Sequence, residues 1–208
     1  MTGNRAVALA LALVLALAGA PALAESRAET LRGWLTENDA KMLVALDDNA
    51  AAKIAEGKAK FTVDGAAIAE IETLLGAPRA PIGPPADIEG EWRIRSLQIT
   101  NFGAYAYPFF KVRIYAEGPP GALVFHKDTG SQRIFAELAA DGSNRYILVG
   151  AGYAGGDPPG EYSTRAYEQP GDPYNDIAGH LYRLADGRLL LVTAPNHLGL
   201  NVLELKRQ

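Results

Sequence analysis

The three histidines of this sequence are the side chains whose chemistry suits proton transfer or metal binding. They are His126, His180 and His197. Neutral imidazole is a common metal ligand and proton carrier. No two of them have the spacing of a metal-binding pair, and the sequence contains no cysteine to complete a site. We therefore expect surface or strand-end histidines, and the sequence predicts no metal site and no cofactor.

His126, Asp128 and Ser131 together contain the residue types of a hydrolase triad. A nucleophile, its base and the group that orients the base must meet in space, whereas these three residues fall along one expected hairpin. No other pair of groups suits acid–base or nucleophilic catalysis. The sequence therefore assigns no catalytic residue and favours a protein without enzymatic activity. A hydrolase that uses His126 or His180 is an alternative.

Residues 127–133 have the composition of a hairpin turn that could also bind an anion. Its Asp and Thr can bond the local backbone, and Gly130 can adopt a positive φ. The main interpretation is that this block sets the register of two strands. The alternative is a small anion-binding patch of Lys127, Gln132 and Arg133, because arginine presents a planar fork of donors to carboxylates and phosphates.

Residues 151–176 form a long segment rich in glycine, proline and tyrosine. Loops of this length are usually functional or disordered, and the tyrosines favour an ordered binding loop. Five acidic side chains in it could supply oxygen ligands to calcium, but they lack the spacing of an EF-hand loop. They are Asp157, Glu161, Glu168, Asp172 and Asp176. Solvated loop charges are the simpler interpretation.

The composition limits the classes of partner. The chain has 208 residues, with 20 Lys and Arg against 24 Asp and Glu and a formal net charge of −4. Such a balance argues against binding to the phosphate backbone of nucleic acids. The absence of cysteine excludes a disulfide framework and a thiol catalyst. A chain of this length can bury a core of its own, as one generous domain or as one domain with a small helical annex.

The N-terminal residues 1–24 have the features of a secretory signal peptide. Arg5 supplies a positive charge, residues 6–18 are an unbroken apolar run, and Pro21 follows the run. The run is too short for a membrane-spanning helix, although an uncleaved N-terminal anchor is the alternative. We expect cleavage after Ala24 and a periplasmic mature protein without a transmembrane segment. Because Arg5 is the one charged residue removed, the mature net charge becomes −5.

Helical patterns occupy residues 25–77. Thr36, followed by Asp39, is a variant of the capping box that begins a helix. A second helix is expected to begin after Asp64 and to end at Gly76 in the left-handed conformation. The first is expected to run as one continuous helix to Gly57, with apolar residues at steps of three and four, namely Leu43, Leu46, Ala50 and Ile54.

Residues 78–89 contain four prolines and are expected to be a stiff linker, because proline fixes φ and lacks a backbone donor. From Gly90 onward the hydrophobic period falls to two, first in residues 92–95 and 110–114, which predicts antiparallel strands. Further strands are expected over residues 122–126, 132–138, 145–149, 179–184, 189–192 and 200–205. About eight such strands favour a barrel or a strongly curled sheet, because closure removes exposed edges. The predicted class is α+β, with an antiparallel β domain over residues 90–208.

Four blocks of the β region, together with the helix start at residues 35–39, resemble a proteobacterial family of exported proteins known as domain of unknown function 4893. The blocks are residues 91–95, 104–110, 127–133 and 202–205. The resemblance spans most of the chain beyond residue 24. It implies export and a shared fold, with no activity to inherit.

A second resemblance is to lipocalin-like barrels, in which a Gly-x-Trp sequence opens the first strand and an arginine near the C-terminus packs over the tryptophan. Gly90, Trp92 and Arg207 are the corresponding residues of this chain. The likeness implies a closed antiparallel barrel with Trp92 buried. A core tryptophan after a turn glycine is the simpler explanation of the same residues.

The sequence thus favours a non-catalytic exported protein that binds a small molecule or a periplasmic protein. Aromatic side chains at a rim favour contact, so the aromatic segment near residue 107 and the tyrosine-rich loop are expected to line the partner surface. The predicted ligand or partner residues are Tyr105, Tyr107, Phe109, Lys127, Gln132, Arg133, Tyr162 and Tyr167. A lipocalin-like inhibitor of an exported protease is the second hypothesis, and the hydrolase is the third.

Overall fold

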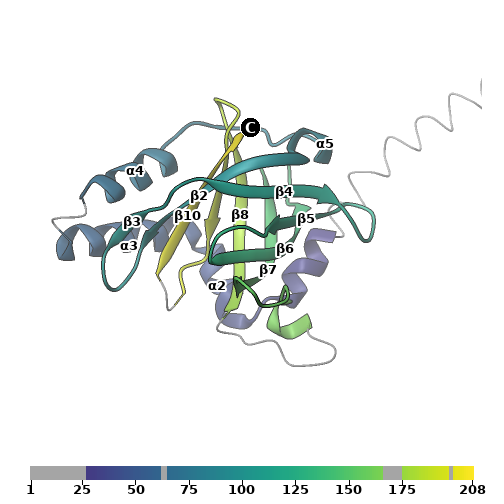
Figure 1. The fold of residues 1–208 in the computed structure, drawn as a ribbon, viewed down its shortest axis with the longest axis horizontal. Coiled ribbons are helices and arrows are strands. Elements are labelled where there is room, and N and C mark those ends of the chain that lie inside the picture. The colour runs from purple at the N-terminus through teal and green to yellow at the C-terminus, as the bar shows by residue number, and fades with distance from the viewer. Residues whose placement is uncertain (1–26, 62–64, 166–174, 197–198) are drawn as a thin grey trace, which may run out of the picture.

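The period-two segments after Gly90 form antiparallel strands in the computed structural model of the chain (Figure 1). The structure describes residues 27–61, 65–165, 175–196 and 199–208. The long strands are β2 (Gly90–Ile99), β4 (Phe110–Ala116), β5 (Ala122–Lys127), β6 (Gln132–Ala140), β7 (Arg145–Ala154), β8 (Asp176–Leu184), β9 (Leu189–Thr193) and β10 (Leu200–Arg207). Each strand expected from the sequence is therefore present, and β7 extends beyond its expected end.

These strands follow one another around a closed ring. Each pairs antiparallel with the next along the chain, and β10 closes the ring by pairing along its whole length with β2. Within the described ranges the sheet has ten strands. Two of these are short, β1 (Arg79–Ala80) and β3 (Ala104–Ala106), and they extend the sheet beside β8 and β2, which leaves eight in the ring. The predicted α+β class with a lipocalin-like antiparallel barrel is confirmed.

Side chains fill the inside of the barrel, because one face of every strand in the ring is apolar. Trp92, Phe125 and Tyr146 are among the largest fully buried side chains. They form one cluster with aliphatic side chains from all eight strands. Gly150 on β7 lies so close to β6 that an added Cβ would be 2.3 Å from the Cα of Ala136. The interior is a packed core.

The short helix α5 (Pro85–Ile88) and the C-terminus lie near one end of the barrel (Figure 1), and Trp92 contacts residues of both segments. Its indole Nε1 donates a hydrogen bond of 2.9 Å to the carbonyl of Ile88. The guanidinium carbon of Arg207 lies 4.1 Å from the centre of the indole ring, and its nitrogens donate to the carbonyls of Glu89 and Asp87. The predicted burial of Trp92 and the packing of Arg207 over it are confirmed.

The helices cover part of the outer face of the barrel. They are residues 27–34, α2 (Glu37–Val44), α3 (Leu46–Lys60) and α4 (Gly65–Leu75), and a short 3-10 helix, η1 (Ser163–Arg165), follows later. Figure 1 shows α3 and α4 beside β2 and β3, and α2 packs against β8. Their apolar side chains form a second core cluster with outward-facing residues of β2 and of β6 to β10. Consequently β9 is buried on both faces, whereas β4 alternates between buried and exposed residues.

The expected single first helix is wrong, because the chain turns at Ala45 and divides it into α2 and α3. The side-chain amide of Asn49 in α3 donates to the carbonyl of Met42 in α2 at 3.1 Å, which connects the two helices across the break. The expected helix start is confirmed, since the backbone N–H of Asp39 donates to the hydroxyl oxygen of Thr36 at 3.2 Å.

The end of α4 also differs from expectation. The backbone of Gly76 is not left-handed, because its N–H still donates to the carbonyl of Glu72 in the helical pattern, at 2.9 Å. Asp64, the expected cap of this helix, lies outside the described residues. The proline-rich segment that follows contains β1 and α5, and it buries Ile82 and Ile88 in the cluster inside the barrel. These prolines therefore occur in a segment that is packed against the core.

Candidate functional site: a cleft on the outer face of the barrel

Two adjoining hollows on the outer side of the barrel share Arg145 and Tyr182. The larger has a volume of about 660 Å³ and lies between β1, the β6–β7 turn and β8. The smaller, of about 280 Å³, lies between the α2–α3 corner and β8. We call both together the outer cleft. The polar side chains that line it are Arg79, Asp141, Ser143, Asn144 and Arg145, together with Asp47, Asp48, His180 and Tyr182.

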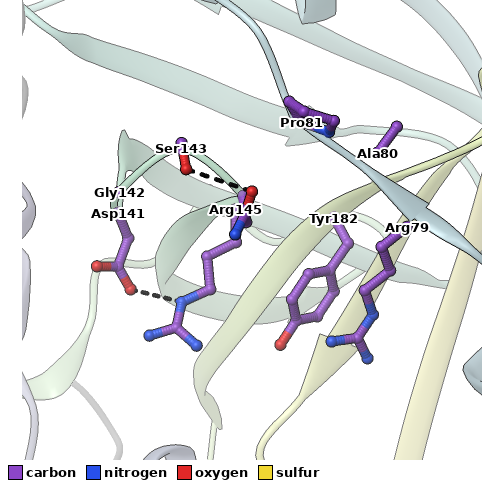
Figure 2. A pocket seen from close by; sticks show the side chains of 9 residues that line it. Arg79, Ala80, Pro81, Asp141, Gly142, Ser143, Arg145 and Tyr182 are labelled. Atoms are coloured by element: carbon purple, nitrogen blue, oxygen red, sulfur yellow. Dashed lines mark hydrogen bonds and ion pairs between the residues drawn. The ribbon is translucent and has the colours of Figure 1, made fainter.

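Strand pairing places two cations on either side of one aromatic ring. Arg145 and Tyr182 are directly opposite each other on β7 and β8, so both side chains emerge on the outer face. Arg79 comes from β1, which pairs with β8 beyond the end of β7, and its guanidinium carbon lies 3.8 Å from the centre of the Tyr182 ring. Figure 2 shows both guanidinium groups and the Tyr182 hydroxyl directed to the same side of the cleft.

Asp141 anchors one wall of the cleft. Its carboxylate accepts a hydrogen bond of 2.8 Å from Nε of Arg145 and another from Arg32 of the first helix. A tight turn holds it, with the Asp141 N–H donating to the Arg145 carbonyl at 2.9 Å and Gly142 at φ 72°. One carboxylate is thus shared by two arginines, and the terminal nitrogens of Arg145 remain directed into the cleft (Figure 2).

His180 lies behind this row and is almost completely buried. Its Nδ1 is 3.3 Å from the Tyr182 hydroxyl, and its Nε2 is 3.8 Å from Oδ2 of Asp141. Burial, and after it the positive charge of Arg145, lowers the pKa of His180 to about 4. Burial also raises the pKa of Tyr182. At neutral pH both side chains are therefore uncharged, so they orient hydrogen bonds and add no charge of their own to the cleft.

The cleft is chemically suited to holding an oxyanion. Arginine offers paired N–H donors to carboxylates and phosphates. Arg79 is held by Asp47 only at 3.4 Å, and the Asp47 side chain is 74% exposed. Such a long and exposed ion pair contributes little, so an incoming anion can replace it. Arg145 then supplies a second set of donors on the other side of the Tyr182 ring.

Four of the residues predicted for a partner surface lie near the opposite end of β2 from α5. Tyr105 on β3 is opposite Gln98 of β2, and the amide of Gln98 donates to that of Gln132 at 3.3 Å. Tyr107 is 6.4 Å from Tyr105 between ring centres, and both rings are partly exposed. Lys127 follows on β5. Its ammonium donates to the carbonyls of Thr129 and Gln132.

Lys127 is less free than its sequence position suggests. The side chain is buried, and burial, followed by the charge of Arg133, lowers the pKa of Lys127 to about 8. Its carbonyl partners close the β5–β6 hairpin, where Gly130 has φ 81°, as expected for this turn. The Thr129 hydroxyl bonds the backbone of Lys111 on β4, which ties the turn to a third strand.

The remaining predicted residues are dispersed. Phe109 packs beneath cations on the outer face of β2 and β10, and Arg133 lies over the ring of Tyr153 at 6.0 Å. Tyr162 is buried, where it donates to Asp39 and accepts a hydrogen bond of 3.1 Å from the Thr36 N–H. It thus secures its loop to the start of α2. Tyr167 lies outside the described residues.

The groups considered for catalysis or metal binding are also separated. His126 bonds the hydroxyl of Tyr153 at 2.9 Å, and Asp128 lies 3.8 Å from Arg113. Asp176 accepts hydrogen bonds from the backbone and hydroxyl of Ser163. Across the described ranges, no group of three or more His, Cys, Asp or Glu side chains is placed to hold a metal ion. His197, Glu168 and Asp172 fall outside those ranges.

Sequence reasoning named His180 as a candidate base but missed the other members of the outer cleft. Arg79, Asp141, Arg145 and Tyr182 belong to β1, a turn and two strands that are far apart along the chain. The turn signal at Asp141 and Gly142 is present in the sequence. Nothing in the spacing shows, however, that β1 joins β8 and brings Arg79 onto the Tyr182 ring.

Comparison with known proteins gives one result. Neither the curated proteins nor the solved structures yield a match. Among the residues that the structure describes, no helix is long and apolar enough to cross a membrane. The model of one family, described as a domain of unknown function (DUF4893), matches residues 31–205, from the first helix into β10. The chain, which folds as a helix-covered, closed antiparallel barrel, therefore belongs to the DUF4893 family.

Proposed function

We propose that this chain is an exported, periplasmic binding protein whose ligand site is the outer cleft and whose ligand is a small organic molecule with a carboxylate or phosphate group. The observation that carries the proposal is the row of Arg79, Tyr182 and Arg145, in which two guanidinium groups flank one aromatic ring. The arginines would bind the anionic group, and the ring edge would contact the rest of the molecule.

The packing of the barrel supports a site on its outside. Barrels that carry a ligand inside enclose a cavity. In this barrel, side chains such as Trp92, Phe125 and Tyr146 are buried in the interior and fill it. Ligand sites are concave and contain a few convergent polar groups. The outer cleft has this form, with a volume of about 660 Å³ in its larger part.

The chemistry of the cleft supports binding better than turnover. A hydrolase would need a nucleophile and a base of matched pKa. His180 is the histidine of the cleft, but its lowered pKa makes it a weak base, and its hydroxyl neighbour is the buried Tyr182. The function that the groups of the cleft support is therefore recognition of an anion.

The test is calorimetric titration of the purified protein with benzoate and phenyl phosphate, with benzamide as the uncharged analogue. We expect the two anions to bind and benzamide not to bind. Arg79→Gln should weaken binding by about tenfold or more, because a charge-assisted pair is lost. Arg183→Gln is the matched control, since Arg183 neighbours Tyr182 on β8 but pairs with Asp87. Equal affinity in wild type and Arg79→Gln would refute the assignment of the cleft.

The proposed export rests on residues 1–24, with Arg5, the apolar run and the small residues before Glu25. Expression in a Gram-negative host followed by osmotic shock should release a protein that begins at Glu25. Intact mass spectrometry measures this directly. A protein that is retained in the cytoplasm with Met1 still attached would contradict export.

A further inference from the structure

Three cations stand directly opposite one another on the outer face of the barrel. Lys206 of β10 is paired with Arg93 of β2, and Arg93 is paired with Lys111 of β4. Paired residues of adjacent antiparallel strands project from the same face of the sheet. Neighbouring strands are about 4.8 Å apart, so the three charges span roughly 10 Å. We call Arg93, Lys111 and Lys206 the cationic row.

The row is electrostatically unfavourable for the fold. Like charges directly opposite each other destabilise a sheet. Each of the three side chains is exposed, and none forms an ion pair with any carboxylate in the described ranges. The two flanking arginines differ, since Arg95 is bound by buried Glu204 and Arg113 lies near Asp128. Among the described residues, the fold thus supplies carboxylates to the cations beside the row, whereas no carboxylate lies within ion-pair distance of the row itself.

Phe109 positions two members of the row. Its ring centre lies 4.1 Å from the Lys206 ammonium and 5.6 Å from the Arg93 guanidinium carbon. A cation over a ring face gains about 0.5–1 kcal/mol at an exposed site, which offsets part of the repulsion. The ring holds these long side chains on the sheet while it leaves their donors open to solvent. The Lys111 backbone is fixed separately by the Thr129 hydroxyl.

We propose that the cationic row is a binding site for a ligand that presents two or three phosphate groups within about 10 Å of one another. Closely spaced phosphates match closely spaced cations, and each phosphate oxygen accepts charge-assisted hydrogen bonds from lysine or arginine. The binding energy then offsets the repulsion that the free protein retains. Such phosphates occur in soluble phosphate chains and in the headgroups of anionic lipids.

The site is independent of the outer cleft. Around the ring, β2, the middle strand of the row, lies four strands from β7 and three from β8, so the row and the cleft face different sides of the barrel. The net charge of the whole chain is −4, so general attraction of anions to the protein does not explain binding at this place. The proposal therefore stands or fails separately from the proposed function.

Calorimetric titration with tripolyphosphate tests the site in its soluble form, and sedimentation with phosphatidylglycerol vesicles tests it against lipid headgroups. The test variant is the triple Arg93→Gln, Lys111→Gln, Lys206→Gln. The control replaces three exposed helix lysines by glutamine and so removes the same charge. These are Lys41, Lys58 and Lys60. We expect wild type and control to bind at least one probe, with affinity falling as salt rises.

The triple variant should bind that probe about tenfold or more weakly. It should also melt at the same or a higher temperature, because like-charge repulsion is relieved. If the triple variant loses binding to tripolyphosphate, the ligand is soluble. If it loses binding to vesicles alone, the ligand is a lipid headgroup. The single Lys111→Gln variant, at an exposed position, repeats the readout in case the triple variant folds poorly. Failure of both probes to bind wild type, or equal weakening in the control, overturns the proposal.

Discussion

Replacing Trp92 by alanine should destabilise the protein more than other single changes in the barrel. The side chain is 2% exposed, and an aromatic side chain of this size buries about 150–250 Å². At roughly 25 cal/mol per Å², this burial contributes about 4–6 kcal/mol, which is an upper estimate because the unfolded chain is already partly compact. The Ile88 carbonyl also loses its donor, and Arg207 loses the ring beneath it. Core replacements of this kind cost about 3–5 kcal/mol.

The assay is urea unfolding followed by far-ultraviolet circular dichroism, because Trp34 would complicate a fluorescence signal. A loss of about 3–5 kcal/mol corresponds to a melting temperature lower by roughly 6–20 °C for a chain of this length. Phe102→Ala is the control, since it removes an aromatic side chain that is 87% exposed and should change stability by less than about 0.5 kcal/mol. If Trp92→Ala and Phe102→Ala lose similar stability, the role assigned to Trp92 in the packed barrel is wrong.

Three further predictions follow from charged and titratable groups. Glu204 is 4% exposed, and its carboxylate is shared by Arg95 and Arg188. Glu204→Gln should therefore lower the free energy of unfolding, measured in urea, by about 3 kcal/mol. A decrease below about 1 kcal/mol would contradict the role of this carboxylate. The pKa of His180 is lowered from 6.5 to about 4 in the folded protein, so between these pH values the histidine is protonated in the unfolded state but neutral in the folded state. The free energy of unfolding should therefore fall by up to roughly 3 kcal/mol as the pH drops from about 6.5 to 4. His180→Gln should flatten this pH dependence, and an unchanged slope would show that other groups cause it. A screen of esterase, phosphatase, peptidase and glycosidase substrates should show no turnover, and activity that disappears in His126→Ala, His180→Ala protein would establish a hydrolase instead.

The strand half of the fold is predictable because its sequence signals are local. Lys111 and Arg113 alternate with buried residues on β4, and this alternation alone predicts a strand with one solvent-exposed face. Glycine turns such as Gly130 and Gly187 mark the hairpins, and both adopt positive φ. Closure could be expected from the number of short connected strands, and the Trp92–Arg207 contact from the resemblance to lipocalin-like barrels.

The parts that sequence reasoning missed depend on tertiary contacts. The break at Ala45 has no glycine or proline to mark it, and it is maintained by packing and by the Asn49 side chain. The two residues of β1 become a strand only because the edge of β8 is free beyond Arg145. The outer cleft needs both of these features, since Arg79 comes from β1 and the smaller hollow lies at the α2–α3 corner. The cationic row was missed for the same reason, because it depends on the pairing register of β10, β2 and β4.

The closing of the ring by β10 has a consequence for how the chain is made. β10 follows the other strands of the ring along the chain and is synthesised after them, whereas its partner β2 is the first of them to leave the ribosome. Until the C-terminal residues emerge, β2 and β9 both keep an open edge, and Trp92 lacks the side chain that covers it. Contacts between segments so distant in sequence form late in folding. A growing chain of this topology therefore keeps its barrel open until β10 has emerged.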